Sequence, residues 1–348
     1  MFTREQTKVI KNKNLTFGGS NKVLIQSMCT FKTSDTTNVI KQIKKCEKNG
    51  ADLMRVSVLD EEDAASIKKI KEKVTIPIVA DIHFDYKLAL KCMENGVDKI
   101  RINPGNIQNK EDLLKIINKA KETDTIIRIG VNSGSLPNKD SNKKESVQIV
   151  NLALEYIDFF EKHNFNKLVI SLKSSNPITT LEVNRLFSKK SNYPLHIGVT
   201  ESGFDEIGII RSISSLSPLL LEGIGNTIRI SLTHDPMKEI NTCKRLLHDL
   251  NLYKEYPTII SCPTCGRCKV DDTKKYAKKI LNYCIKKKKY ITVAIMGCIV
   301  NGIGEGKNAD IGIAGADKKF IIFKKGQQLK IVDQENVLNE LYKEIDLI

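Results

Sequence analysis

A closely spaced group of cysteines near the C-terminus could bind a metal. Cys262, Cys265 and Cys268 form a C-x-x-C-x-x-C pattern, and Cys298 follows at the end of a strand-like run, in MGCIVNGIGEG. Paired thiolates on a tight loop, joined by another from a distant strand end, suit either a tetrahedral zinc ion or an iron-sulfur cluster. The spacing alone does not separate these two kinds of site.

Glu305 is a candidate ligand of a different kind, because it lies seven residues after Cys298 in a glycine-rich loop. An oxygen ligand exchanges at iron more readily than a thiolate, so it would leave one iron of a [4Fe-4S] cluster open to a substrate oxygen. Cys268 is expected to be a bystander, and the role of Cys29 stays open. The thiols expected to pack as small apolar side chains in helices are Cys46, Cys92, Cys243 and Cys284.

Basic side chains recur in strand-like runs that should otherwise be apolar. Arg55, Arg101, Arg128 and Arg229, four of the nine arginines in the chain, lie in such runs, and Lys173 ends another. A charge inside a strand that is buried on both faces is costly unless something neutralises it. We therefore expect these side chains to serve a common purpose.

Few acids accompany these cations, chiefly Asp81 and Glu201. Five cations against two acids leave a positive surplus, which favours a phosphate-bearing ligand over internal salt bridges. The two-residue period of a strand places further polar side chains on the same faces. The pairs so placed are Arg101 with Asn103, Arg128 with Asn132, Asp81 with His83, His196 with Thr200, and Arg229 with Ser231.

Eight short apolar or alternating runs, separated by helical patterns, must position these side chains. They are VLIQSM, DLMRVSV, PIVADIH, KIRINPG, IIRIGVN, KLVISLK, PLHIGVT and TIRISL. Eight such units in about 250 residues predict a TIM (β/α)8 barrel, whose active sites lie at the carboxyl ends of the strands; a doubly wound sheet is the weaker alternative. The pattern changes near Tyr256, so we expect a barrel over residues 1–255 and a small α+β domain over residues 256–348.

The bulk composition is that of a globular protein, with 41% hydrophobic and 28% charged residues. The net charge of +15 comes mostly from lysines on helical patterns, which are typical of solvated faces, so nucleic-acid binding is not expected. No apolar run has the length of a membrane span or a secretory signal, and nine cysteines argue against a secreted disulfide framework. We therefore expect a cytoplasmic protein.

The segments that carry these residues resemble one family, that of the 4-hydroxy-3-methylbut-2-enyl diphosphate synthases of the methylerythritol phosphate route to isoprenoids, in its short bacterial two-domain form. The resemblance runs nearly end to end. The segments are VLIQSM, MRVSV, VADIHFDY, IRINPGNI, RIGVNSGSL, PLHIGVTESG, GIGNTIRISL, SCPTCGRC and MGCIVNG.

This resemblance implies a TIM barrel followed by a small iron-sulfur domain like those of sulfite and nitrite reductases. It implies reductive ring opening and dehydration of 2-C-methyl-D-erythritol 2,4-cyclodiphosphate to 4-hydroxy-3-methylbut-2-enyl diphosphate through a [4Fe-4S] cluster. Two single-electron transfers would come from reduced flavodoxin or ferredoxin. It also implies a head-to-tail homodimer, in which the cluster domain of one chain closes over the barrel of the other.

The resemblance also assigns roles to individual residues. Glu201 matches the proposed acid-base group, Asn301 matches an asparagine close to the substrate, and Glu305 would yield its iron to the substrate. The implied cluster ligands are Cys262, Cys265, Cys298 and Glu305. The implied substrate-binding residues of the barrel are Arg55, Asp81, His83, Arg101, Asn103, Arg128, Asn132, Lys173, His196, Thr200, Arg229 and Ser231.

Three positions depart from the family pattern: Cys29 in QSMC, Asn226 in GIGNT and Ile303 in VNGIGEG, where proline is usual. Losing that proline loosens the loop that carries Glu305. The alternative function is a phosphate-binding barrel lyase or pterin-type synthase with a structural zinc site, which predicts zinc and no colour. A basic zinc-binding nucleic-acid protein is a further alternative, but it leaves the arginines in the strands unexplained.

Overall fold

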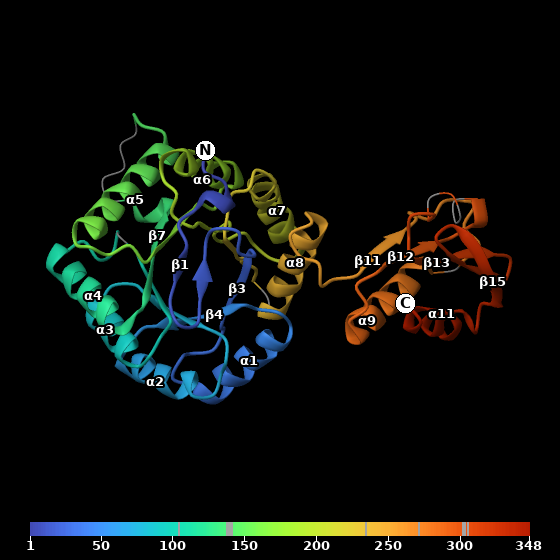
Figure 1. Cartoon of the computed structure of the whole chain (residues 1–348), viewed down its shortest axis with the longest axis horizontal. Helices are drawn as coiled ribbons and strands as arrows, with labels where there is room; N and C mark the ends of the chain where they lie inside the picture. Colours follow the sequence, from blue (N-terminus) through green and yellow to red (C-terminus); the bar gives the residue numbers. More distant parts are fainter. Residues whose placement is uncertain (104, 137–141, 234, 271, 301–303, 305) are drawn as a thin grey trace. The chain divides into compact units, whose positions relative to one another are not determined.

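The computed structural model describes the chain except for residues 104, 137–141, 234, 271, 301–303 and 305. Asn301, Ile303 and Glu305 therefore lie outside the described residues. The described chain forms two compact units, Met1–Leu252 and Tyr253–Ile348 (Figure 1). Within the described residues, no helix has both the length and the apolar character needed to cross a membrane.

The first unit is an eight-stranded parallel sheet that curls into a barrel, in the order β8-β7-β6-β5-β4-β3-β10-β9. A bridge between Ile170 of β8 and Leu195, just before β9, brings the two ends of the sheet together. The strands are β3 (Leu24–Met28), β4 (Leu53–Val58), β5 (Ile78–Ile82), β6 (Lys99–Ile102), β7 (Ile126–Asn132), β8 (Leu168–Lys173), β9 (His196–Ile197) and β10 (Thr227–Ile228). All eight predicted runs contain a strand, and the predicted TIM barrel is confirmed.

Helices ring this barrel, one after each strand (Figure 1). They are α1 (Thr36–Lys48), α2 (Glu61–Lys71), α3 (Tyr86–Glu94), α4 (Lys110–Thr123), α5 (Glu145–Lys162), α6 (Pro177–Lys190), α7 (Asp205–Leu221) and α8 (Pro236–Asp249). Most begin at an Asp or Asn whose side chain accepts a backbone N–H of the first turn, which stabilises the start of a helix. These N-cap residues are Asp35, Asp60, Asp85, Asn109, Asn176 and Asp235.

A short N-terminal hairpin, which the sequence did not predict, covers the amino-terminal end of the barrel. It consists of β1 (Ile10–Lys11) and β2 (Thr16–Phe17), and it follows the 3-10 turn η1 (Arg4–Gln6). β1 lies across the middle of the helix ring in Figure 1. Phe17 is 1% exposed and packs under the amine of Lys99, 4.4 Å from the ring centre. This hairpin does not cover the opposite end of the barrel, where the carboxyl ends of the strands lie.

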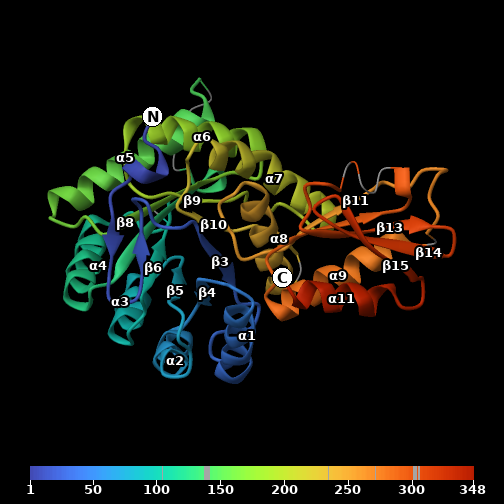
Figure 2. The same cartoon turned by 45° about the vertical axis from the view of Figure 1, so that its right-hand side comes forward.

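The second unit is a five-stranded sheet in sequence order, parallel from β11 to β13 and antiparallel from β13 to β15. Figure 2 shows helices α9 and α11 along one face of this sheet, and their apolar sides join its core. The elements are β11 (Thr258–Ser261), α9 (Thr273–Lys287), β12 (Thr292–Met296), β13 (Ile311–Ala316), β14 (Lys319–Lys324), β15 (Gln327–Asp333) and α11 (Val337–Asp346).

Candidate active site

A polar pocket of about 270 Å³ opens at the carboxyl ends of the barrel strands. It gathers the predicted barrel residues except Asn103 and His196, and it adds Ser171 of β8, which the sequence analysis missed. Ser171 lies two residues before Lys173, so the strand period could have identified it. The lining residues are Arg55, Asp81, His83, Arg101, Arg128, Asn132, Ser171, Lys173, Thr200, Glu201, Arg229 and Ser231.

Asp81 is the anionic centre of this pocket. Its carboxylate lies 3.3 Å from the guanidinium of Arg101, 3.4 Å from the His83 ring and 3.8 Å from Arg55. Burial alone would raise the pKa of Asp81, but Arg55, the His83 hydrogen bond and Arg101 together hold that pKa well below its usual value. The ionised form of Asp81 is therefore favoured, and its carboxylate is the common partner of these three side chains.

Arg229 has a dedicated partner that the sequence analysis did not anticipate. Glu239 of α8 is buried and accepts two hydrogen bonds from Arg229, each 3.0 Å long. It also accepts from Ser27 at 2.6 Å and from the backbone N–H of Leu232 at 3.0 Å. The two acids expected, Asp81 and Glu201, belong to the strand runs, and this third acid lies on the helix that follows β10. Arg229 therefore forms an internal salt bridge with Glu239.

Arg55 is less well paired. Its Nε and Nη2 donate to the thioether of Met28 at 3.1 and 2.9 Å, and Arg229 also approaches this sulfur at 3.5 Å. A thioether is a weak acceptor, so it is a poor substitute for an anionic oxygen. Burial and the neighbouring cations lower the pKa of Arg55 to about 10, partly offset by Asp81. An anion in the pocket would satisfy these donors better.

Arg128 is the most deeply buried cation of the pocket, at 1% exposure. Its Nε and Nη1 have no hydrogen-bond partner among the described residues. Burial first, and then Arg55 and Arg101, lower the pKa of Arg128 well below its usual value. Unpaired buried donors are rare in native proteins. These two donors would suit the oxygens of an anionic ligand.

Lys173 is also buried, and its amine lies 3.2 Å from His196 Nε2. His196 was expected at the pocket mouth, but it lies behind Lys173, fully buried, with its Nδ1 2.5 Å from the hydroxyl of Thr227. Burial, followed by Arg128, lowers the pKa of Lys173 well below its usual value. The pocket thus contains an amine that an anionic ligand would charge.

Glu201 lies on the exposed rim of the pocket, directly after Thr200. Its backbone has φ 51°, in the left-handed region that a side chain other than glycine rarely adopts. Such strain often occurs where a side chain must be aimed at a reacting group. The carboxyl group of Glu201 is thus open to solvent and lines the same pocket as the buried cations.

Asn103, which was predicted to bind the substrate, does not line the pocket. It is buried, and its side-chain oxygen accepts the backbone N–H of Gly105 at 3.1 Å, which shapes the loop after β6. The neighbouring Arg101 needs Gly130 on β7, because a methyl group there would lie 2.6 Å from Arg101 Nε. The glycine of the IIRIGVN run thus makes room for the guanidinium.

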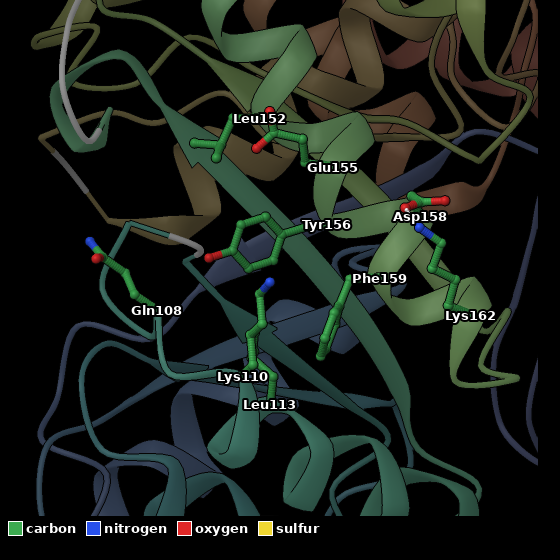
Figure 3. A pocket seen from close by; sticks show the side chains of 9 residues that line it. All are labelled: Gln108, Lys110, Leu113, Leu152, Glu155, Tyr156, Asp158, Phe159 and Lys162. Carbon is green, nitrogen blue, oxygen red and sulfur yellow. Dashed lines mark ion pairs between the residues drawn. The ribbon is translucent and has the colours of Figure 1, made fainter.

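A larger cavity, of about 660 Å³, lies on the outside of the barrel between α4 and α5 (Figure 3). Tyr156 and Phe159 of α5 face Lys110 and Leu113 of α4 in this view. Its charged groups are mixed in sign, and it lies on the outer side of the helices, with none of the strand arginines among its lining residues. The smaller polar pocket is therefore the better candidate for an active site.

The predicted cluster cysteines lie at the carboxyl ends of neighbouring strands in the second unit. Ser261 of β11 pairs with Ile295 of β12, so Cys262 and Cys298 follow strands that end at the same edge. Cys298 is buried, while Cys265 is exposed. Hydrogen bonds from the backbone and side chain of Arg267 lower the pKa of Cys265, which favours its thiolate.

Gly297 fits closely between two of these thiols. Its backbone N–H donates to Cys262 Sγ at 3.1 Å. A methyl group at Gly297 would lie 2.5 Å from Cys268 Sγ and 3.4 Å from Cys262 Sγ, so a side chain there would displace the sulfurs. Cys268 donates to the carbonyl of Val270 at 3.2 Å, in keeping with a bystander role.

The donor set fits an iron-sulfur cluster in its chemistry. Thiols from two adjacent strand ends and an N–H directed at sulfur are features of such sites. Among the residues that the structure describes, no three His, Cys, Asp or Glu side chains gather as the ligands of a single metal ion do. The ligand set therefore rests on residue type and placement.

The other cysteines are buried and have no such surroundings. Burial raises the pKa of Cys29, Cys46, Cys92 and Cys243 to about 12, and that of Cys284 to about 11. These thiols are protonated at neutral pH and pack as apolar groups. Cys29, whose role was left open, therefore belongs with the packed thiols of the helices.

Asn226, one of the departures from the family pattern, is explained by its hydrogen bonds. Its side-chain oxygen accepts the backbone N–H of Leu195 at 3.0 Å, and its Nδ2 donates to the hydroxyl of Thr7 at 3.0 Å. An ionised aspartate has no N–H to donate. The asparagine thus ties the strand ends to the N-terminal segment.

Solved structures similar to this chain include dihydropteroate synthases. The enzyme from Yersinia pestis with a pterine-sulfa conjugate has a TM-score of 0.52 and 10% identity, and it covers 70% of this chain and 100% of that one. A second Yersinia pestis structure has a TM-score of 0.51, 11% identity and coverage of 70% and 98%. At such identity the likeness shows the barrel fold alone.

Sequence relatives match the whole chain. The protein called 4-hydroxy-3-methylbut-2-en-1-yl diphosphate synthase (flavodoxin) is 49% identical in Caldanaerobacter subterraneus, over 99% of this chain and 97% of that one. Its Clostridium perfringens counterpart is 47% identical over 99% of both chains. The GcpE TIM-barrel domain matches residues 7–244, and the GcpE protein C-terminal domain matches residues 258–347. This chain belongs to the GcpE family.

Proposed function

We propose that this protein is a 4-hydroxy-3-methylbut-2-enyl diphosphate synthase, an iron-sulfur oxidoreductase of isoprenoid precursor biosynthesis. Its reaction opens the ring of 2-C-methyl-D-erythritol 2,4-cyclodiphosphate, consumes two electrons and releases water. Membership of the GcpE family supports the reaction. The observation that carries the assignment of the site is Arg128, whose two unpaired donors lie in a pocket with a surplus of cations.

In this proposal the pocket binds the cyclic diphosphate by charge. Arg55 exchanges the Met28 sulfur for phosphate oxygens, and Arg128 gains the acceptors that it lacks. Asp81 keeps His83 and Arg101 oriented toward the ligand. Because Arg229 remains paired with Glu239, its main contribution is to the shape of the pocket.

Cys262, Cys265, Cys298 and Glu305 would hold a [4Fe-4S] cluster, which supplies single electrons and a Lewis-acidic iron when bound. Glu201 is the proposed general acid, because it lies on the rim of the same pocket and can exchange protons with water. Asp81 is excluded from this role, since its pKa is held too low for it to carry a proton.

The proposed electron donor is a reduced flavodoxin, the donor in the name of the relatives, with ferredoxin as the alternative. The proposed assembly is a head-to-tail homodimer. Exposed apolar side chains support it, because they occur both beside the pocket, at Leu59, Phe84 and Phe204, and beside Cys298, at Ile299 and Val300. Such groups suit a surface that is covered when a partner chain closes over the pocket.

The first test is the metal content and colour of protein purified without oxygen. We expect about four irons per chain and a broad absorption band at about 400 nm that dithionite bleaches. Turnover of the cyclodiphosphate by this protein with reduced flavodoxin then tests the reaction. A colourless protein with about one zinc per chain, even after anaerobic reconstitution with iron and sulfide, would favour the zinc-containing lyase or synthase instead.

A further inference from the structure

The amine of Lys173 is held from behind by two residues that do not line the pocket. His196 Nε2 lies 3.2 Å from the Lys173 amine, and His196 Nδ1 lies 2.5 Å from Thr227 Oγ1. His196 and Thr227 are both 0% exposed. These three side chains form a buried series that starts in β10, passes through β9 and ends in the pocket at the last residue of β8.

The charge of Lys173 determines which atom donates in each contact. When a bound anion makes the amine an ammonium, it can only donate, so His196 Nε2 then accepts from it. The proton of a neutral imidazole then lies on Nδ1, where it is donated to the Thr227 hydroxyl. Burial and the positive charge of Lys173 lower the pKa of His196 well below its usual value, which keeps the ring neutral and able to accept.

Gly198 limits the position of the amine from another side. A methyl group on Gly198 would lie 2.9 Å from Lys173 Nζ and 2.4 Å from the carbonyl oxygen of Arg229. A side chain at this position would therefore push the amine away from His196. The glycine of the PLHIGVT run leaves room for Lys173.

We propose that His196 is a positioning residue, set in one tautomer by Thr227, that fixes the Lys173 amine for contact with the anionic ligand. His196 acts through Lys173 and does not touch the ligand itself. This inference rests on the proposed function, because it assumes that the pocket binds a phosphate-bearing ligand. It goes beyond that function by replacing the expected role of His196 in substrate contact.

The proposal predicts a pH dependence of ligand binding. Burial and the surrounding cations favour the neutral amine of Lys173 in the empty pocket, whereas a bound diphosphate favours the ammonium. Binding therefore takes up a proton, and affinity falls as the pH rises above the pKa of the amine in the empty pocket. The charged and titratable groups around Lys173 and His196 are Arg55, Asp81, His83, Lys99, Arg101, Arg128, Glu201, Arg229, Glu239 and Cys243.

The test is calorimetric titration of the full-length protein with inorganic pyrophosphate across pH 7 to 9.5, in two buffers of different ionisation enthalpy. His196→Leu should weaken binding about tenfold and move the fall in affinity to lower pH, because the ammonium loses its acceptor. His196→Gln should restore most of the affinity, since its amide oxygen can accept from Lys173. Thr227→Val should resemble His196→Leu, and Thr227→Ser should resemble the unsubstituted protein.

A double-substitution cycle separates positioning from a contact of His196 with the ligand. In a Lys173→Met background, His196→Leu should change pyrophosphate affinity by less than about twofold. Additive losses in the double variant, or an unchanged affinity and pH profile in His196→Leu and Thr227→Val, would overturn the proposal while the proposed function stands. If the unsubstituted protein bound neither pyrophosphate nor the cyclodiphosphate, the proposed function and this inference would fall together.

Discussion

At the scale of single residues, the pocket differs from an ordinary salt-bridge network because its partners are unequal. Arg229 donates two charge-assisted hydrogen bonds to Glu239, whereas Arg128 has two donors without an acceptor among the described residues. Breaking or omitting a partner of a buried charge costs several kcal/mol. This difference gives the two arginines separate roles in the proposed site.

Replacing Arg128 by methionine should therefore stabilise the empty protein and abolish its response to a ligand. The free energy of unfolding should rise by about 1 to 2 kcal/mol, because an uncompensated buried charge is replaced by an apolar group of similar length. Pyrophosphate should raise the melting temperature of the unsubstituted protein but not that of Arg128→Met. Arg211→Met, at an exposed position of α7, is the control and should behave like the parent. A less stable Arg128→Met that still responds to pyrophosphate would contradict the ligand role.

Glu201 should affect turnover without affecting binding. We expect Glu201→Gln to bind pyrophosphate normally and to lose about 100-fold or more in turnover, since the amide keeps the shape of the side chain but cannot give a proton. Steady-state kinetics of the cluster-loaded enzyme measure the loss. Glu206→Gln, at an exposed position near the start of α7, serves as the control. Unchanged turnover in Glu201→Gln would remove this carboxyl group from the mechanism.

At the scale of elements, the regular parts of the fold could be predicted and the irregular parts could not. The barrel strands are buried on both faces, so they appear as apolar runs in the sequence, and any charge within them is conspicuous. The hairpin that carries Phe17 has strands of two residues, too short for a periodic pattern. Glu239 lies in an ordinary amphipathic helix, where a carboxylate gives no signal of burial. His196 is on the predicted strand, but the period of a strand does not say how deep a side chain lies.

The close fit of Gly297 between two thiols allows a prediction about the cysteine site. Gly297→Ala should prevent cluster assembly, because the added methyl group would meet Cys268 Sγ at 2.5 Å and displace Cys262. Gly266→Ala, between Cys265 and Cys268 in the loop after β11, is the control, since an added methyl group there has nothing within 4 Å. Iron content after anaerobic reconstitution measures both. Adding Cys268→Ala to the Gly297→Ala variant should restore part of the iron, and Cys268→Ser alone should keep all of it. Loss of iron in Cys268→Ser would instead make that thiol a ligand.

At the scale of the whole molecule, the two units divide the chemistry between them. Met1–Leu252 carries the cations that suit a diphosphate, and Tyr253–Ile348 carries the thiols that suit a cluster. Neither set can complete the proposed reaction without the other. The proposed head-to-tail homodimer joins the barrel of one chain to the cluster unit of its partner, which makes each active site a shared one.

This arrangement predicts that two inactive variants restore activity when they are combined. Glu201→Gln damages the barrel half of an active site, and Cys262→Ser damages the cluster half. A dimer of one chain of each variant therefore contains one active site with both defects and one active site with neither. Random mixing of equal amounts after unfolding and joint refolding should return about a quarter of the parental turnover, because half of the dimers are mixed and each has one intact site. Each variant refolded alone is the control. Turnover that stays at the level of the separate variants, although mixed dimers are detected by mass spectrometry, would place barrel and cluster of one site in the same chain.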